Sequence, residues 1–169
     1  IGNVQLSLGN DKMAEVAFRR ALAGESSLSS AVGQAINYAN LGAILEGRGQ
    51  IDSARYYYSQ SLKFNEMAGS DLGISLCHTH FGRLYENDGD LDQAADEYIK
   101  AYDVLAGTRD KWHWLEACMS LSRVYCKQGR LNLAESYLKK AKEESIRLNS
   151  LGHIADAYRL EYGIFKKKG

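Results

Sequence analysis

The stretch LGAILEGRGQIDSARYYYSQS, residues 41–61, decides the fold of this chain. On both sides of Gly49 its apolar residues recur at steps of three or four positions, which is the spacing of one face of an α-helix. Leu41 lies on the stripe before the glycine, and Ala54 and Tyr58 lie on the stripe after it. A glycine between two such stripes predicts two helices joined by a tight turn.

The same pattern recurs every 40 residues along the chain. The turn glycines are Gly9, Gly49, Gly89 and Gly129, and the alanines that follow them by five residues are Ala14, Ala54, Ala94 and Ala134. A fixed period of about 20–50 residues is typical of solenoids, whose repeats bury their apolar faces against one another. We therefore predict an all-α solenoid of antiparallel helix pairs, as a single domain of about four repeats over residues 1–169.

Each repeat is expected to have a first helix before its glycine and a second helix after it. The predicted helices cover about residues 10–23, 30–47, 51–67, 71–87, 91–106, 110–127, 131–148 and 152–167. Asp52, Asp92 and Asn132 fall where second helices start, as N-caps or first-turn acids. The pattern is cut at Ile1-Gly2 and again after Tyr162-Gly163, so we expect a fragment of a longer array, with self-association through the open repeat ends as one outcome.

Composition argues against several classes of partner. The 21 basic residues balance 21 acidic ones, and no basic block is longer than residues 166–168, so we expect no nucleic-acid binding by this segment. No apolar run approaches the roughly 20 residues that span a bilayer, so we expect no membrane contact by this segment. The cysteines, Cys77, Cys118 and Cys126, do not form a disulfide framework. Free thiols favour a cytoplasmic location, and a periplasmic one stays open.

The sequence contains few residue patterns that could carry catalysis or metal binding. No nucleophile elbow, P-loop or HExxH zinc motif occurs in the sequence. Cys77 and His80 lie three residues apart, and Cys118 and His113 follow in the next repeat. A structural zinc site needs four converging ligands, so we expect these side chains in the core or the groove. We predict no catalytic residue, no metal site and no cofactor.

The aromatic clusters have two possible roles: their side chains pack inside the fold, or they contact a partner. We expect Trp114 to pack between helices, whereas Trp112 is either a packing residue or an anchor for a partner. In the run of three tyrosines, Tyr58 is expected in the core, and Tyr56 and Tyr57 at an inter-repeat seam or the surface.

The order of residues in each repeat resembles the tetratricopeptide repeat. A large–small pair such as Leu41-Gly42 is followed by an aromatic or apolar residue, the turn glycine, an alanine, an aromatic residue and a small one. The period of 40 is longer than the common form of about 34 residues. The resemblance implies a right-handed superhelix whose first helices line a concave groove for extended segments, and it implies no catalysis. We expect a protein-interaction scaffold that binds a peptide or partner segment; the alternative is a sensory or regulatory module of a larger bacterial signalling or transcription-regulating protein.

The resemblance also implies which residues line the groove. They follow one another at steps of four residues along each first helix. The positions are Ala39, Ala43 and Gly47, then Thr79, Arg83 and Asn87, then Met119, Arg123 and Lys127, with Glu46, Glu86 and Glu116 beside them. Arg83 and Arg123, one repeat apart, are expected to contact carboxylates or carbonyls of the bound segment, and Lys127 and Asn87 extend the polar strip. The alternative is a solvated helix face with ion pairs inside each helix.

Overall fold

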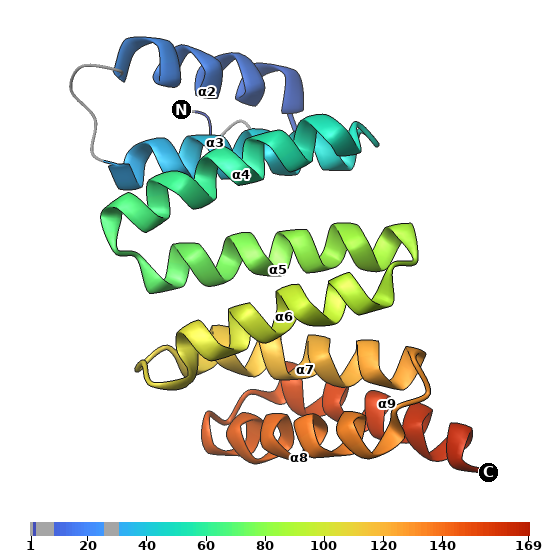
Figure 1. The fold of residues 1–169 in the computed structure, drawn as a ribbon. Helices are drawn as coiled ribbons and strands as arrows, with labels where there is room; N and C mark the ends of the chain where they lie inside the picture. The colour runs from blue at the N-terminus through green and yellow to red at the C-terminus, as the bar shows by residue number, and fades with distance from the viewer. Residues whose placement is uncertain (1, 3–8, 26–30) are drawn as a thin grey trace. The chain divides into compact units, whose positions relative to one another are not determined.

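In the computed structural model, the described residues are residue 2, residues 9–25 and residues 31–169. They form eight delimited helices and no β-strand, which confirms the all-α fold class (Figure 1). The helices are α2 (Asp11–Glu25), α3 (Ala31–Gly47), α4 (Ile51–Ala68), α5 (Asp71–Asp88), α6 (Leu91–Ala106), α7 (Lys111–Lys127), α8 (Leu131–Arg147) and α9 (Leu151–Lys168). Each predicted boundary agrees to within a few residues. Ile1, which the sequence pairs with Gly2, lies outside the described residues.

The chain divides into two compact units, residues 1–77 and residues 78–169. Unit 1 contains α2, α3, α4 and the first part of α5, and unit 2 contains the rest of α5 and α6 to α9. Helices that follow one another in the sequence pack together within each unit, for example α3 with α4 and α7 with α8. A single domain over residues 1–169 stays a prediction.

The turn glycines adopt the conformation that the sequence pattern predicts. Gly49, Gly89 and Gly129 have φ values of +73°, +83° and +75°, in the left-handed region that only glycine enters without strain. After α3, the amide of Gly49 donates to the carbonyl of Glu46 at 2.9 Å and the amide of Gln50 donates to that of Leu45 at 2.9 Å. This pair of bonds is a Schellman motif, which satisfies carbonyls left open at the helix end.

The starts of the second helices only partly agree with the sequence prediction. Asp90 is the N-cap of α6, and its side chain accepts a hydrogen bond from the amide of Gln93 at 3.1 Å. Asp52 and Asp92 lie in the first turns of α4 and α6, which is the second of the two predicted roles. Asn132 lies inside α8, because Arg130 takes the N-cap position without a side-chain bond. A cap at Asn132 is therefore wrong.

Small residues of the first helices make room for aromatic residues of the second helices. A Cβ atom added to Gly42 would lie 2.6 Å from Cε1 of Tyr58, and one added to Gly82 would lie 2.6 Å from Cε1 of Tyr98. Both tyrosines are buried, as predicted for Tyr58. The small residue of each large–small pair therefore allows the ring of the second helix to pack on the backbone of the first.

The alanines of the repeat lie in the core of each unit. Ala14 and Ala54 in unit 1 and Ala94 and Ala134 in unit 2 are all 0% exposed. In unit 2 a further link comes from Ser122, whose hydroxyl donates to the carbonyl of Ala134 at 2.9 Å. The periodic stripe of the sequence is thus the packed face of each second helix.

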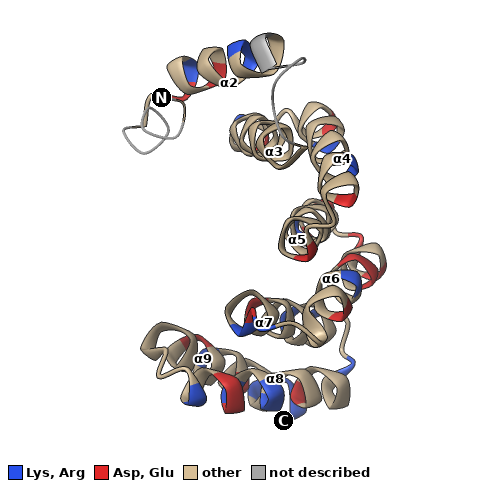
Figure 2. Ribbon diagram, turned by 90° about the vertical axis from the view of Figure 1, so that its left-hand side faces the viewer, with Lys and Arg blue, Asp and Glu red and all other residues tan. Residues whose placement is uncertain are grey.

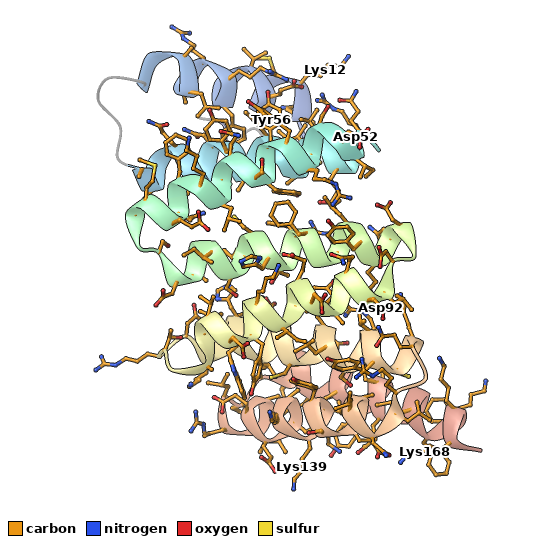
Figure 3. The ribbon with its side chains drawn as sticks, viewed as in Figure 1. Lys12, Asp52, Tyr56, Asp92, Lys139 and Lys168 are labelled. Carbon is orange, nitrogen blue, oxygen red and sulfur yellow. The ribbon has the colours of Figure 1, made fainter. Side chains whose placement is uncertain are left out.

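Both charged and apolar side chains lie on the exposed faces of the helices. Side chains including Lys12, Asp52, Tyr56 and Asp92 point away from the ribbon in Figure 3, and Tyr56 is 57% exposed, which confirms its predicted surface position. Lys, Arg, Asp and Glu are interspersed along the helices in Figure 2. None of the helices in the described part of the chain has both the length and the hydropathy needed to cross a bilayer.

Candidate partner-binding site

Five residues of the predicted groove lie on two first helices of unit 2. Thr79, Arg83 and Asn87 lie on α5, and Arg123 and Lys127 lie on α7. Asn87 is exposed, Thr79 and Arg83 are half-buried, and the side chains of Arg123 and Lys127 are 41% and 49% exposed. These five residues are called the α5/α7 strip below.

Of the other four predicted groove residues, Ala39, Ala43 and Gly47 lie on α3 and Met119 lies on α7. Ala43 is exposed on α3 in unit 1. Met119 is only 8% exposed and packs with Leu115, Cys118 and Ala141, so its predicted groove position is wrong. A step of four residues turns about 40° beyond a full helical turn, so two steps from Lys127 back to Met119 carry the stripe from the surface into the core.

The cations of α7 meet a carboxylate of α5. Arg123 donates from Nε to Oε1 of Glu86 at 3.0 Å and from Nη2 to Oε2 at 3.1 Å, which is a bidentate pair. Nζ of Lys127 lies 2.9 Å from the same Oε1, and the hydroxyl of Tyr98 on α6 donates to Oε2 at 2.9 Å. The side chain of Glu86 is 7% exposed. One buried carboxylate thus orders two partly exposed cations from the next repeat.

The electrostatics of this cluster keep Glu86 ionised. Burial raises the pKa of Glu86, but the hydrogen bonds from Arg123 and Lys127 outweigh burial and lower it to about 2. Burial and the neighbouring carboxylate raise the pKa of Tyr98, so its hydroxyl stays protonated and donates. With two cations and one carboxylate, the cluster is positive at neutral pH. An anion that approaches the exposed parts of Arg123 and Lys127 is therefore attracted.

The sequence pattern places Glu86 only beside the groove and does not indicate this anchoring role. A usable signal was present, because Tyr58 donates to Glu46 at 2.7 Å just as Tyr98 donates to Glu86, and both pairs are 12 residues apart. The glutamate at the end of a first helix and the core tyrosine of the second helix thus form a repeated pair. The spacing of apolar residues does not reveal this pair, because the hydroxyl and the carboxylate are polar.

Arg83 makes a hydrogen bond within its own helix. Its Nη2 donates to Nδ1 of His80 at 2.9 Å, one turn earlier on α5. An arginine can only donate, so His80 accepts at Nδ1 and carries its proton on Nε2. The equivalence of Arg83 and Arg123 as groove residues stays a prediction.

The residues weighed for metal binding do not form a site. Among the described residues, no group of three or more His, Cys, Asp or Glu side chains is arranged to hold a metal ion. Cys77 and Cys118 are buried free thiols. Burial raises the pKa of both, and that of Cys118 reaches about 12, so they are neutral thiols rather than metal-binding thiolates.

The two tryptophans separate into a packed and an exposed residue. The ring of Trp114 lies 5.3 Å from that of Tyr102, centroid to centroid, which confirms its predicted packing between helices. Trp112 is 49% exposed, and its ring lies nearly perpendicular to that of His153, with 4.5 Å between the ring centroids. A partner contact at Trp112 stays a prediction.

The helix pairs, their glycine turns and the packing of second-helix rings on small first-helix residues define an all-α fold of tetratricopeptide-like helical repeats. This class is typical of protein–protein interaction modules. A family model described as tetratricopeptide repeat matches residues 114–155, which confirms the resemblance seen in the sequence. No curated protein matches the sequence.

Solved structures show the same fold over nearly the whole chain. BtubC from P. vanneervenii has a TM-score of 0.77 at 15% identity, with 99% of this chain and 72% of that chain covered. A protein of nearly identical TPR-like repeats from Podosopora anserina, described as a kinesin light chain, has a TM-score of 0.70 at 16% identity, with 99% and 86% covered. Aspartyl phosphate phosphatase F from Bacillus subtilis has a TM-score of 0.89 at 11% identity, and this chain covers 46% of its length. At such identities the likeness concerns the fold.

Proposed function

We propose that this chain is a protein-interaction module that binds an extended peptide or partner segment on the α5/α7 strip, without catalysis. The observation that carries the proposal is the ordering of Arg123 and Lys127 by buried Glu86, with 41% and 49% of their side chains left exposed. Ordered cations lose less conformational entropy when they bind, so contacts to them contribute more to affinity.

The chemistry of the strip favours a segment that carries carboxylates. A charge-assisted hydrogen bond to Arg123 or Lys127 contributes roughly 1.5–3 kcal/mol where water is excluded, and under about 1 kcal/mol where it is not. Asn87 and Thr79 offer an amide and a hydroxyl, which both donate and accept hydrogen bonds. Backbone groups of an extended segment match these two residues, and its acidic side chains match the cations.

The first test compares short capped peptides of equal length that are acidic or neutral, by fluorescence anisotropy. We expect the acidic peptides to bind, with affinity that falls as salt rises. Lys127→Ala tests the strip with the least disturbance of the fold, because Glu86 keeps its bidentate pair with Arg123. We expect this variant to weaken peptide binding about fivefold, or about 1 kcal/mol. Lys139→Ala removes an exposed lysine of α8 and is the matched control.

The second test removes both arginines of the strip. Arg83→Ala with Arg123→Ala leaves Glu86 buried without its main partner, so Glu86→Gln is added to preserve the fold. Most of the affinity should be lost while the helical circular dichroism is unchanged. Equal binding of acidic and neutral peptides, or normal binding by this variant, would show that the site is placed wrongly.

A further inference from the structure

Helix α7 carries two groups of exposed side chains on one face, one group towards each end of the helix. Trp112 and Glu116 lie near its N-terminal end, and Arg123 and Lys127 lie near its C-terminal end. They follow one another at steps of four, seven and four residues, which places them on one helix face. Trp112 is 49% exposed, and the other three side chains are 47%, 41% and 49% exposed. The exposed face of α7 therefore has an aromatic end and a cationic end.

This face belongs to a helix that already contacts the first helices of the repeats before and after its own. Glu86 of α5 binds Arg123, and His153 of α9 packs against Trp112. Helix α7 also packs on its own second helix, α8. In a repeat array each unit contacts only its neighbours, and both neighbours of α7 are described. The exposed side chains of α7 are thus a surface of the folded array rather than an end of it.

Trp112 is ordered by side chains at the start of α9. The indole ring lies nearly perpendicular to the ring of His153, with 4.5 Å between the centroids, which is a favourable aromatic geometry. Nδ1 of His153 lies 2.8 Å from Oγ of Ser150, and its Nε2 lies 3.8 Å from Oε1 of Glu116. The side chain of His153 is 13% exposed. A largely buried imidazole therefore orders a half-exposed indole, just as Glu86 orders the two cations.

The two ends of the face are far enough apart to contact different residues of one bound segment. Trp112 lies 11 positions before Arg123, which corresponds to about 16 Å along the helix axis. An extended segment advances about 3.3 Å per residue, so it covers this distance in about five residues. Glu116 lies between the two ends and repels acidic residues of the segment. Acidic residues of the segment are thus confined to the end at Arg123 and Lys127.

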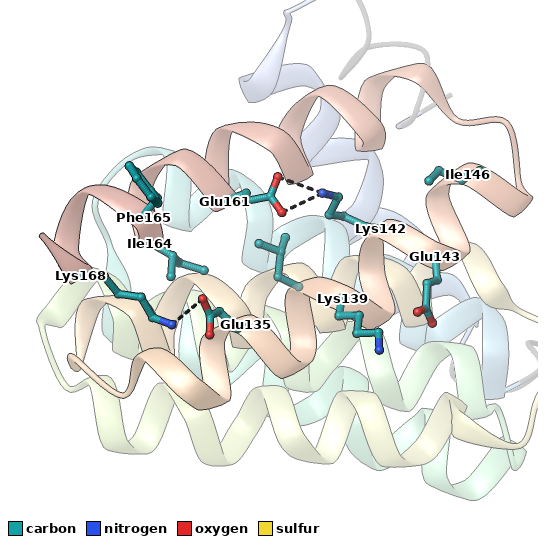
Figure 4. Close-up of a pocket in the computed structure, with 10 residues that line it drawn as sticks. Glu135, Lys139, Lys142, Glu143, Ile146, Glu161, Ile164, Phe165 and Lys168 are labelled. Carbon is teal, nitrogen blue, oxygen red and sulfur yellow. Dashed lines mark hydrogen bonds and ion pairs between the residues drawn. The ribbon is translucent and has the colours of Figure 1, made fainter.

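The groove between α8 and α9 does not offer an acidic segment the same attraction. It has a volume of about 680 Å³ (Figure 4). Within it, Lys142 pairs with Glu161 at 2.8 Å and Lys168 pairs with Glu135 at 2.7 Å. Each of these lysines has a carboxylate of its own, whereas the two cations of α7 share Glu86. The uncompensated positive charge therefore lies on α7, where it attracts an acidic segment.

We propose that the segment bound on the α5/α7 strip carries an apolar side chain about five residues from its acidic residues, and that this side chain packs on Trp112. The contact rests on the proposed function, because it concerns the same bound segment. Burial of an apolar side chain against the indole adds affinity that does not depend on charge, and aromatic anchors of this kind dominate many interfaces. The cations then select acidic segments, and Trp112 selects among them.

Capped peptides of equal length and equal charge test the spacing by fluorescence anisotropy. All contain the same acidic pair. One peptide has no apolar residue, two have a leucine about five positions before or after the pair, and one has a leucine next to the pair. We expect one of the two spaced peptides to bind about tenfold more tightly than the peptide without leucine. The leucine next to the pair should add little, because it does not reach Trp112.

A double-mutant cycle assigns the gain in affinity to Trp112. Trp112→Ala should bind the peptides with and without the spaced leucine equally, whereas Trp112→Phe keeps an aromatic ring and should retain part of the gain. Lys127→Ala should weaken all the peptides by the same factor, because they share the acidic pair. Tyr56→Ala, at a tyrosine of unit 1 that is 57% exposed, is the matched control and should leave the gain unchanged. Helical circular dichroism should be the same in all variants.

Failure at Trp112 can be told apart from failure of the whole strip. If the acidic peptides bind but the leucine adds nothing at either spaced position, the contact at Trp112 is wrong and the strip remains the binding site. The same holds if Trp112→Ala keeps the full gain. If none of the acidic peptides binds, both the strip and the contact at Trp112 are wrong.

Discussion

Glu86 is a buried carboxylate whose charge is compensated by side chains from two other helices. Burial of a charge is costly unless partners replace the lost water, and here Arg123, Lys127 and Tyr98 do so. A single residue thus links α5 to α7 and presents two cations at the surface. The same contacts make the stability of unit 2 depend on pH.

Glu86 should make the folded chain less stable at acid pH. The pKa of Glu86 is about 2 in the folded chain against an ordinary 4.5, so its stabilising effect is present above about pH 4.5 and is lost as pH falls towards 2. The shift corresponds to about 3 kcal/mol. In urea denaturation the unfolding free energy of Glu86→Gln should therefore fall less than that of the unaltered chain over this window. Glu116→Gln, at a half-exposed glutamate of α7, is the control. If the unfolding free energies of the unaltered chain and of Glu86→Gln fell equally with pH, the ion pair of Glu86 and Arg123 would not contribute to stability.

First and second helices approach closely because the first helix has a glycine, which carries no side chain, at the point of contact. At Gly82 the backbone of α5 touches the ring of Tyr98 on α6, and Gly42 does the same for Tyr58. The ring then fills the space that a side chain would take. Glycine weakens a helix by about 1 kcal/mol relative to alanine, so its presence inside α5 reflects packing.

Gly82→Ala is accordingly predicted to destabilise the chain by about 1–3 kcal/mol, because the new Cβ would lie 2.6 Å from the tyrosine ring. The gain in helix propensity offsets only part of this. Gly152→Ala in α9, where nothing lies within 4 Å, is the matched control and should be neutral or stabilising. The measurement is the midpoint of chemical denaturation of each variant, compared with that of the unaltered chain. Greater stability of Gly82→Ala would contradict the packing argument.

The whole molecule consists of two compact units, each with buried residues of its own. In a repeat protein each element is stabilised mainly by its neighbours in the array, so opening is local rather than global. The large buried residues of unit 2 include Leu121, and those of unit 1 include Leu41.

Native-state hydrogen exchange should reveal this locality. Leu121→Ala removes a fully buried side chain of α7 and should cost about 2–5 kcal/mol. We expect the loss of amide protection to be larger in α7 and α8 than in α3. Leu41→Ala in α3 provides the reciprocal comparison, with the larger loss in α3 and α4. Equal loss along the whole chain in both variants would contradict local opening.

The helices, their turns and their buried faces were predictable because they depend on nearby residues. A glycine with positive φ and a stripe of period 3.6 act within one or two helical turns, and the 40-residue register repeats the signal. The Glu86–Arg123 pair, 37 residues apart, was not predictable in this way. Neither was the burial of Met119, which a four-residue step placed on the groove.

The sequence specifies the class of fold: which segments are helices, where they end, and which face of each helix is packed. These features follow from backbone conformation and from the spacing of apolar and small residues. The positions of the helices in space, by contrast, set which polar atoms meet and bring Glu86 to Arg123 and Lys127. Ion pairing depends on which side chains lie nearby in space. Helical periodicity does not specify these neighbours.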